Sequence, residues 1–115
     1  MKAAITKKLG GYRQQDRKFD IFSAHHFIPA ATVETMLAEC DMKCHYCKVA
    51  MLLEYPARDP KQWTLDRIDN TMGHNSGNIV ICCLGCNLQR RNRSVAKFLF
   101  TKQLCIVKKG AEFIE

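Results

Sequence analysis

Two Cys-x-x-Cys pairs are the residues whose type and spacing most directly support chemistry: Cys44 with Cys47, and Cys83 with Cys86. Such a gap lets one tight turn offer two thiolates to one ion, and zinc takes four ligands of this kind in a tetrahedron. Because cysteine fills all four positions, no place remains for water or substrate. The sequence therefore predicts a structural zinc, and any catalysis must use other residues. Redox dithiols are the alternative.

The stretch enclosed by the two pairs adds an ordered set of polar residues. It reads Leu65-Asp66-Arg67-Ile68-Asp69-Asn70, then Gly73-His74, then Gly77-Asn78-Ile79-Val80, then Cys83-Leu84-Gly85-Cys86-Asn87, followed by Arg90 and Arg91. From about Cys44 to Arg93 the chain resembles the HNH endonucleases of the ββα-metal (His-Me finger) superfamily. The resemblance implies a small α+β fold with flanking helices. Its core would be a hairpin followed by a helix around one catalytic divalent cation, braced by the separate four-cysteine zinc.

The implied catalytic cation would be Mg2+ or Mn2+, which prefer oxygen ligands to thiolates. Asp66 and Asn87 offer a carboxylate and an amide oxygen, and a hairpin that folds back can bring both to one ion. Such an ion would hold the scissile phosphate and assist the departing 3′ oxygen. A turn or capping role is the alternative for Asp66. Asn78 matches a family asparagine that fixes the loop through backbone hydrogen bonds, or else it is a turn residue after Gly77.

The general base is the point at which the chain departs from the family. The residue after the metal-binding aspartate is commonly a histidine, but here it is Arg67, which stays protonated because its pKa lies above about 12. Arg67 could instead clamp a phosphate oxygen. His74, with an ordinary pKa near about 6.5, is the preferred base. The pair His25 and His26 lies outside the matched region, and His45 is expected to orient or shield the zinc.

The net charge of +7 is unevenly distributed. No acidic residue lies between Asp69 and Glu112, a stretch rich in lysine and arginine. Such segments attract polyanions, and nucleic acid is the favoured partner, although an ordinary solvated surface is the alternative. The predicted contacts to a nucleic-acid backbone are Arg90, Arg91, Arg93 and Lys97, of which Arg90 and Arg91 would share one helix face with Asn87.

Periodicity predicts the elements that position these residues. Val33, Met36, Leu37 and Cys40 recur at helical spacing, with Thr32 as the N-cap. The predicted strands are Val49–Tyr55, Trp63–Ile68 and Ile79–Cys82, with turn formers between the last two. A helix is predicted from Leu84 to about Arg93, another after the cap Ser94, and a weak strand in the tail after Lys102. Trp63 and Tyr46 are predicted core residues, and a role as stacking partners is the alternative.

The chain fits one domain of 115 residues. We expect a basic N-terminal arm over 1–28, the zinc-braced nuclease-like domain over 29–103 and a C-terminal extension over 104–115. No apolar run approaches the roughly 20 residues that span a bilayer, and no signal peptide is evident. An intracellular protein of the cytoplasm or nucleus, neither secreted nor membrane-bound, is expected. Cys40, Cys82 and Cys105 should be buried hydrophobes, and a substitute zinc ligand is the alternative for Cys82.

These observations lead to a metal-dependent endonuclease that hydrolyses DNA phosphodiester bonds, with RNA not excluded. The alternative is a catalytically impaired, zinc-containing nucleic-acid-binding module that keeps the HNH fold. A protein-interaction zinc domain is the third reading, and the uninterrupted basic stretch argues against it. So short a chain leaves room for a homodimer or a targeting partner.

Overall fold

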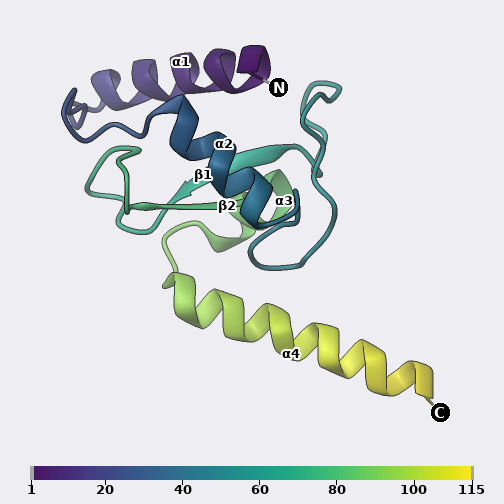
Figure 1. The fold of residues 1–115 in the computed structure, drawn as a ribbon. Coiled ribbons are helices and arrows are strands. Elements are labelled where there is room, and N and C mark those ends of the chain that lie inside the picture. The colour runs from purple at the N-terminus through teal and green to yellow at the C-terminus, as the bar shows by residue number, and fades with distance from the viewer. Residues whose placement is uncertain (1, 115) are drawn as a thin grey trace.

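The computed structural model describes the backbone of residues 2–114 and the side chains of residues 2–106. Within this range it is a small α+β protein with four helices and one two-stranded antiparallel sheet (Figure 1). The elements are α1 (Lys2–Lys18), α2 (Ala30–Glu39), β1 (Trp63–Arg67), β2 (Ile79–Cys83), α3 (Leu84–Arg90) and α4 (Val95–Ile114). None of the helices described here is long and apolar enough to cross a membrane.

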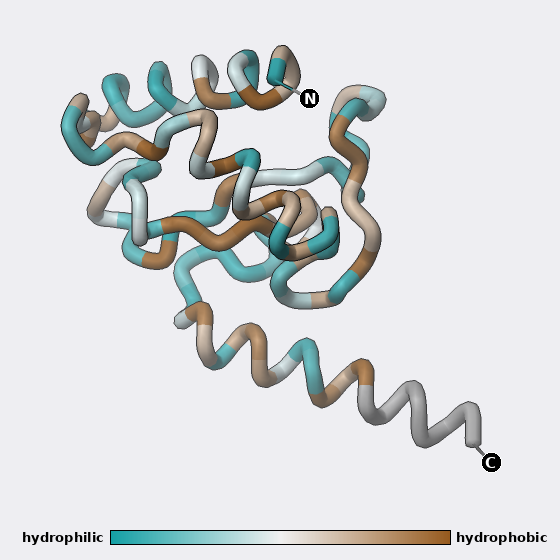
Figure 2. Tube along the Cα trace, in the orientation of Figure 1, coloured by the Kyte–Doolittle hydropathy of each residue, from teal (hydrophilic) through white to brown (hydrophobic). Residues whose placement is uncertain are grey.

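The hairpin of β1 and β2 forms the centre of the molecule. Trp63 pairs with Cys83 at one end and Arg67 with Ile79 at the other. Leu65 and the residues facing it are almost fully buried, which suits apolar and β-branched side chains in a covered sheet. Figure 2 shows the hydrophobic stretch along β2. The strands predicted at Trp63–Ile68 and Ile79–Cys82 are confirmed, each within one residue at its end, and α3 follows β2 directly.

The N-terminal segment differs from the expected arm. It forms α1, a helix of 17 residues that runs beside α2 along one edge of the body (Figure 1). Ile5 and Leu9, one helical turn apart, are 0 % and 3 % exposed and belong to the core. Only these few apolar positions face inward, so the basic residues around them obscure the periodicity. The helix brings residues from the start of the chain to the hairpin.

Two other local predictions around the first cysteine pair are wrong. Val49–Tyr55 is not a strand, because only isolated bridges join Ala50 to Lys43 and Leu52 to Gln62. Thr32 is not the N-cap of α2, because the helix begins at Ala30 with Pro29 in the capping position at φ −74°. Proline has no N–H and a restricted φ, which suits a helix start, so the helix begins three residues earlier than predicted.

The C-terminal helix α4 extends away from the body (Figure 1). Ser94 precedes it, and its Oγ accepts a hydrogen bond from the Lys97 amide at 3.4 Å. Phe98 is buried and packs edge-on against Tyr46, with ring centroids 4.8 Å apart. The strand predicted after Lys102 is wrong, because the helix continues there to Ile114. A strand needs a partner to satisfy its backbone, whereas a helix satisfies its own.

Candidate functional site

The four cysteines of the two pairs come together as predicted. Their sulfur atoms all lie within 4.8 Å of one another, and Sγ of Cys47 is 3.8 Å from Sγ of Cys83. A tetrahedron with Zn–S bonds of about 2.3 Å has sulfur–sulfur edges of about 3.8 Å. Cys44, Cys83 and Cys86 are buried and Cys47 is half-buried. The cluster could therefore hold a zinc ion.

Backbone amides prepare the cluster for thiolates. The amide of Tyr46 donates to Sγ of Cys44, and the amide of Cys86 donates to Sγ of Cys83, which caps α3. Hydrogen bonds from the thiols of Cys83 and Cys86 lower the pKa of Cys44. The hydrogen bonds with Cys44 raise the pKa of Cys83 and Cys86, so in the cluster without metal the thiolate form is favoured at Cys44.

Three other cysteines lie outside this cluster. Cys82 is fully buried, and its sulfur lies 3.5 Å from Oγ1 of Thr64. Burial raises the pKa of this thiol, which favours its neutral form, so Cys82 acts as a core residue and not as a substitute ligand. Cys40 is half-buried. Cys105 is exposed, which corrects the expectation that every free cysteine is buried.

Asp66 is a buried carboxylate engaged by two neighbours. Arg90 donates from Nε to Oδ2 at 2.6 Å and from Nη2 to Oδ1 at 2.8 Å. Tyr46 donates from its hydroxyl to Oδ2 at 2.9 Å. The hydrogen bonds with Asp66 raise the pKa of Arg90. A bidentate pair of this kind is a strong interaction, and it ties α3 to β1.

The prediction that Arg90 grips a nucleic-acid backbone is corrected by this pair. Its side chain is 1 % exposed and faces β1. Arg91 caps α3 with φ at +54°, so the chain changes direction immediately after Arg90. Arg91, Arg93 and Lys97 are all exposed and remain available for contacts. Two adjacent arginines thus have opposite environments, because a buried guanidinium requires a charged partner and, among the side chains of residues 2–106, only that of Arg90 has one.

An open pocket of about 490 Å³ lies beside the hairpin. Asp66, Arg67, His74, Asn87 and Arg91 line it together with residues of α1. These five come from β1, the long hairpin loop, and α3 with its C-terminal residue. The fold therefore collects the predicted metal ligands, the predicted base and two of the predicted phosphate contacts around one cavity.

Two side-chain oxygen atoms of this pocket keep lone pairs that accept no hydrogen bond from the described residues. A carboxylate has about four lone-pair sites, and Asp66 uses three of them, which leaves one on Oδ1. Asn87 donates from Nδ2 to Oγ1 of Thr64 at 3.0 Å, and its Oδ1 accepts no hydrogen bond from the part of the chain that is described. Hard cations prefer oxygen atoms of these kinds as ligands, whereas the positive charge of Arg90 beside Asp66 opposes the binding of a cation.

His74 is buried, in contrast to an ordinary loop histidine. Its ring nitrogen Nδ1 lies 2.7 Å from Oδ1 of Asp16, and its backbone amide donates to Oδ2 of the same carboxylate at 2.7 Å. The ring of Tyr12 lies over the imidazole, with centroids 4.3 Å apart. Burial lowers the pKa of His74, and the hydrogen bond that the ring makes to Asp16 opposes that effect. His74 is therefore largely neutral at neutral pH.

Asp16 is the site residue that sequence reasoning missed. It lies in α1, which the sequence suggested was a loosely ordered basic arm, and 58 positions separate it from His74. No local spacing connects the two residues. The only available signal was an acidic residue among basic neighbours, a pattern that surface helices show routinely.

Asn78 and Arg67 hold the hairpin loop. Asn78 accepts from the amide of Asp69 at 2.8 Å, and its Nδ2 donates to the carbonyls of Asp69 and Gly73, each at 3.0 Å. These three hydrogen bonds fix the loop between β1 and β2. Arg67 donates from Nη1 to the carbonyls of Asn70 at 3.3 Å and Met72 at 3.2 Å. Both side chains thus restrict the loop that carries His74.

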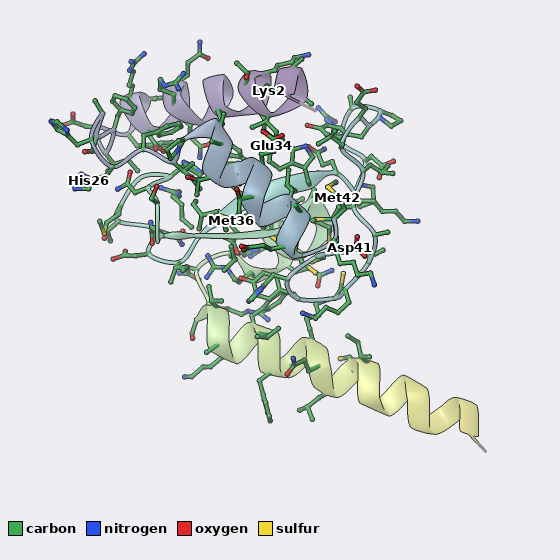
Figure 3. All side chains as sticks on the ribbon, viewed as in Figure 1. Lys2, His26, Glu34, Met36, Asp41 and Met42 are labelled. Carbon is green, nitrogen blue, oxygen red and sulfur yellow. The ribbon has the colours of Figure 1, made fainter. Side chains whose placement is uncertain are left out.

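The other histidines lie away from this pocket. His26 lies in the loop after α1, labelled in Figure 3, where it is exposed and its Nδ1 bonds Oγ of Ser23 at 2.8 Å. His45 packs edge-on against Tyr46 at 5.1 Å, and burial lowers its pKa. Tyr46 and Trp63 are fully buried, which confirms them as core residues.

No protein-family model, curated protein or solved structure matches this chain.

Proposed function

We propose that this protein is an HNH-type endonuclease that hydrolyses phosphodiester bonds in DNA. The observation that carries the proposal is the single pocket lined by Asp66, Arg67, His74, Asn87 and Arg91 at the junction of the hairpin and α3. In the same proposal the ββα arrangement of β1, β2 and α3 is a nuclease core. The four-cysteine cluster is its structural zinc site, because a site closed by four thiolates takes no substrate.

Each residue of the pocket has a definite part in this proposal. Asp66 and Asn87 would hold Mg2+ or Mn2+, which would neutralise charge that develops on the phosphate and the departing oxygen. His74 supplies the proton acceptor that Arg67 cannot provide. Its neutral form is favoured because burial lowers its pKa. Arg67 and Arg91 contact phosphate oxygens and compensate their charge.

DNA is the proposed substrate because the exposed charges continue beyond the pocket. Arg91 and Arg93 lie in the connection from α3 to α4 and Lys97 lies in the first turn of α4, and all three are exposed. Lysine and arginine contacts to phosphates release counterions, so binding through them weakens steeply as salt rises. Contacts of this kind provide affinity with little sequence readout. We infer a non-specific or weakly specific DNA-binding surface.

The Arg90–Asp66 pair favours a second candidate function. A guanidinium held within 2.6 Å of the carboxylate competes with a divalent cation, and the usual base position is occupied by Arg67. A chain that keeps this pair closed would bind nucleic acid through its exposed arginines without cutting it. The second candidate is therefore a zinc-containing nucleic-acid-binding module.

A nicking assay separates the two functions. Purified protein is incubated with supercoiled plasmid while Mg2+ or Mn2+ is titrated, and the open-circular product is measured. Asn87→Ala is preferred to an Asp66 variant because it leaves the buried pair with Arg90 intact. We expect Asn87→Ala to lower nicking about 10- to 100-fold, and the exposed Asn92→Ala to leave it unchanged.

The endonuclease is excluded if the parent protein does not nick plasmid at any concentration of either cation. It is also excluded if Asn87→Ala cuts as fast as the parent. Salt-sensitive plasmid binding without cutting selects the binding module.

A further inference from the structure

Asp16 is a fully buried carboxylate that points at one residue only among those described. Its side chain is 0 % exposed, and both of its oxygens contact His74: Oδ1 reaches the ring nitrogen Nδ1, and Oδ2 accepts from the backbone amide. A buried charge is costly unless hydrogen bonds compensate it. α1 therefore carries a costly group whose only described hydrogen-bond partner is the histidine of the pocket.

The backbone around His74 leaves this contact little freedom. A Cβ on Gly73 would lie 2.6 Å from Oδ2 of Asp16 and 2.8 Å from the carbonyl oxygen of Ile21, so only glycine fits between them. On the other side, the amide of Ile28 donates to the carbonyl of His74 at 2.9 Å. The loop is thus packed against the end of α1, and the imidazole and carboxylate are held in one relative position.

This geometry determines which ring nitrogen carries the proton. A carboxylate only accepts hydrogen bonds, so Nδ1 must carry the hydrogen that Asp16 receives. In the neutral ring the lone pair then lies on Nε2, on the opposite side of the imidazole from Asp16. His74 lines the pocket with Asp66 and Arg67, so the free nitrogen is the one available there.

We propose that Asp16 is a positioning residue that fixes the Nδ1–H tautomer of His74 and so presents Nε2 as the proton acceptor of the pocket. Its catalytic consequence rests on the proposed endonuclease function. The groups around the imidazole are the carboxylate of Asp16 and the ring of Tyr12 from α1, and the charges of Asp66 and Arg67 from β1.

In the proposed step, Nε2 of His74 takes a proton from water as the water oxygen forms a bond to phosphorus. The bond from phosphorus to the 3′ oxygen breaks with its electron pair on that oxygen, which gains a proton from solvent. The products are a 5′ phosphate and a 3′ hydroxyl. Asp16 stabilises the imidazolium that forms, because its charge faces Nδ1. His74 then returns its proton to solvent.

The Asp16→Asn variant tests the tautomer directly. The backbone amide of His74 needs an acceptor, so the side-chain oxygen of the introduced asparagine takes that place and its NH2 group faces Nδ1. Nδ1 must then accept, and the proton moves to Nε2. We expect 15N NMR of the metal-free pocket to show protonated Nδ1 in the parent and protonated Nε2 in the variant. Asp20→Asn, which removes the same charge from an exposed neighbouring position, should keep the parent pattern.

The same spectra can overturn the proposal. Protonated Nε2 in the parent contradicts it and needs no variant, so the test survives if Asp16→Asn fails to fold. An unchanged tautomer in a folded Asp16→Asn protein contradicts it as well.

Nicking by the same proteins measures the catalytic consequence. We expect Asp16→Asn to lower the turnover rate about 10²- to 10⁴-fold through the wrong tautomer, with little change in plasmid binding. If the parent nicks and a folded Asp16→Asn nicks equally fast, the positioning role is wrong and the endonuclease stands. If the parent shows protonated Nδ1 but does not nick, the endonuclease is wrong and the positioning of His74 stands.

Discussion

The two ends of the central hairpin solve different structural problems. At the end where Trp63 pairs with Cys83, the four cysteine sulfur atoms lie within 4.8 Å of one another and surround one possible metal position. At the end where Arg67 pairs with Ile79, the long loop turns a histidine back toward an open pocket. The first end is closed and uses soft ligands, whereas the second is open and uses oxygen and nitrogen donors.

The difference between these ends lies in how each group is held. In each pair the two cysteines are three positions apart, and a backbone amide of the same segment donates to Sγ of Cys44 and to Sγ of Cys83. In the pocket, by contrast, two polar side chains are held by distant elements: Asp66 by Arg90 of α3, and His74 by Asp16 of α1. The comparison shows that a metal-cluster framework can be encoded locally, while a polar pocket depends on tertiary packing.

Removing one cysteine of the four-cysteine cluster should have the largest effect on the stability of the protein. Apparent zinc-binding free energies of about 10–16 kcal/mol equal or exceed the ~5–15 kcal/mol stability of a typical domain. We expect Cys86→Ser to lose the proposed zinc and the folded state, measured by elemental analysis and circular dichroism. The exposed Cys105→Ser should keep both. A folded Cys86→Ser protein, or a parent with appreciably less than one zinc per chain, contradicts the structural zinc.

Breaking the Arg90–Asp66 pair should have the next largest effect. Removal of one partner leaves a buried charge, so Asp66→Asn and Arg90→Met should each cost about 3–5 kcal/mol of unfolding free energy. The double variant should cost less than the sum of the two, by about 2–3 kcal/mol. Urea unfolding measures all three, and the exposed Arg91→Met should change stability by less than about 0.5 kcal/mol. Additive losses would show that the two side chains are not coupled.

The smallest expected effect is the change of stability with pH that comes from His74. Because burial lowers its pKa in the folded state, the unfolded chain binds a proton first as the pH falls below about 6.5. The unfolding free energy should therefore decrease below that pH, and His74→Gln should reduce the decrease. Urea unfolding from pH 7.5 to 5 measures it, with the exposed His25→Gln as the matched control. Equal slopes in the parent and His74→Gln would refute this account.

The local features were the predictable ones. Strands β1 and β2 and the helix that carries Val33 and Leu37 followed from local spacing, because each depends on neighbours within a few residues. The grouping of the two cysteine pairs, which lie far apart in the sequence, followed from the four ligands that zinc requires. The helix in the N-terminal segment was missed, because only a few apolar positions of α1 face the core. The tail after Lys102 was mistaken for a strand, because a short apolar run does not distinguish the two structures.

The sequence by itself determined the two cysteine turns, the hairpin and the helix that follows it, since these arise from short-range spacing and turn chemistry. Only the tertiary structure decided that Arg90 is buried on Asp66 while Arg91 is exposed, and that Asp16 holds His74 from 58 positions away. The physical reason is the cost of a buried charge. That cost is met by whichever partner the packing of α1, β1 and α3 brings near, and residue spacing does not specify that partner.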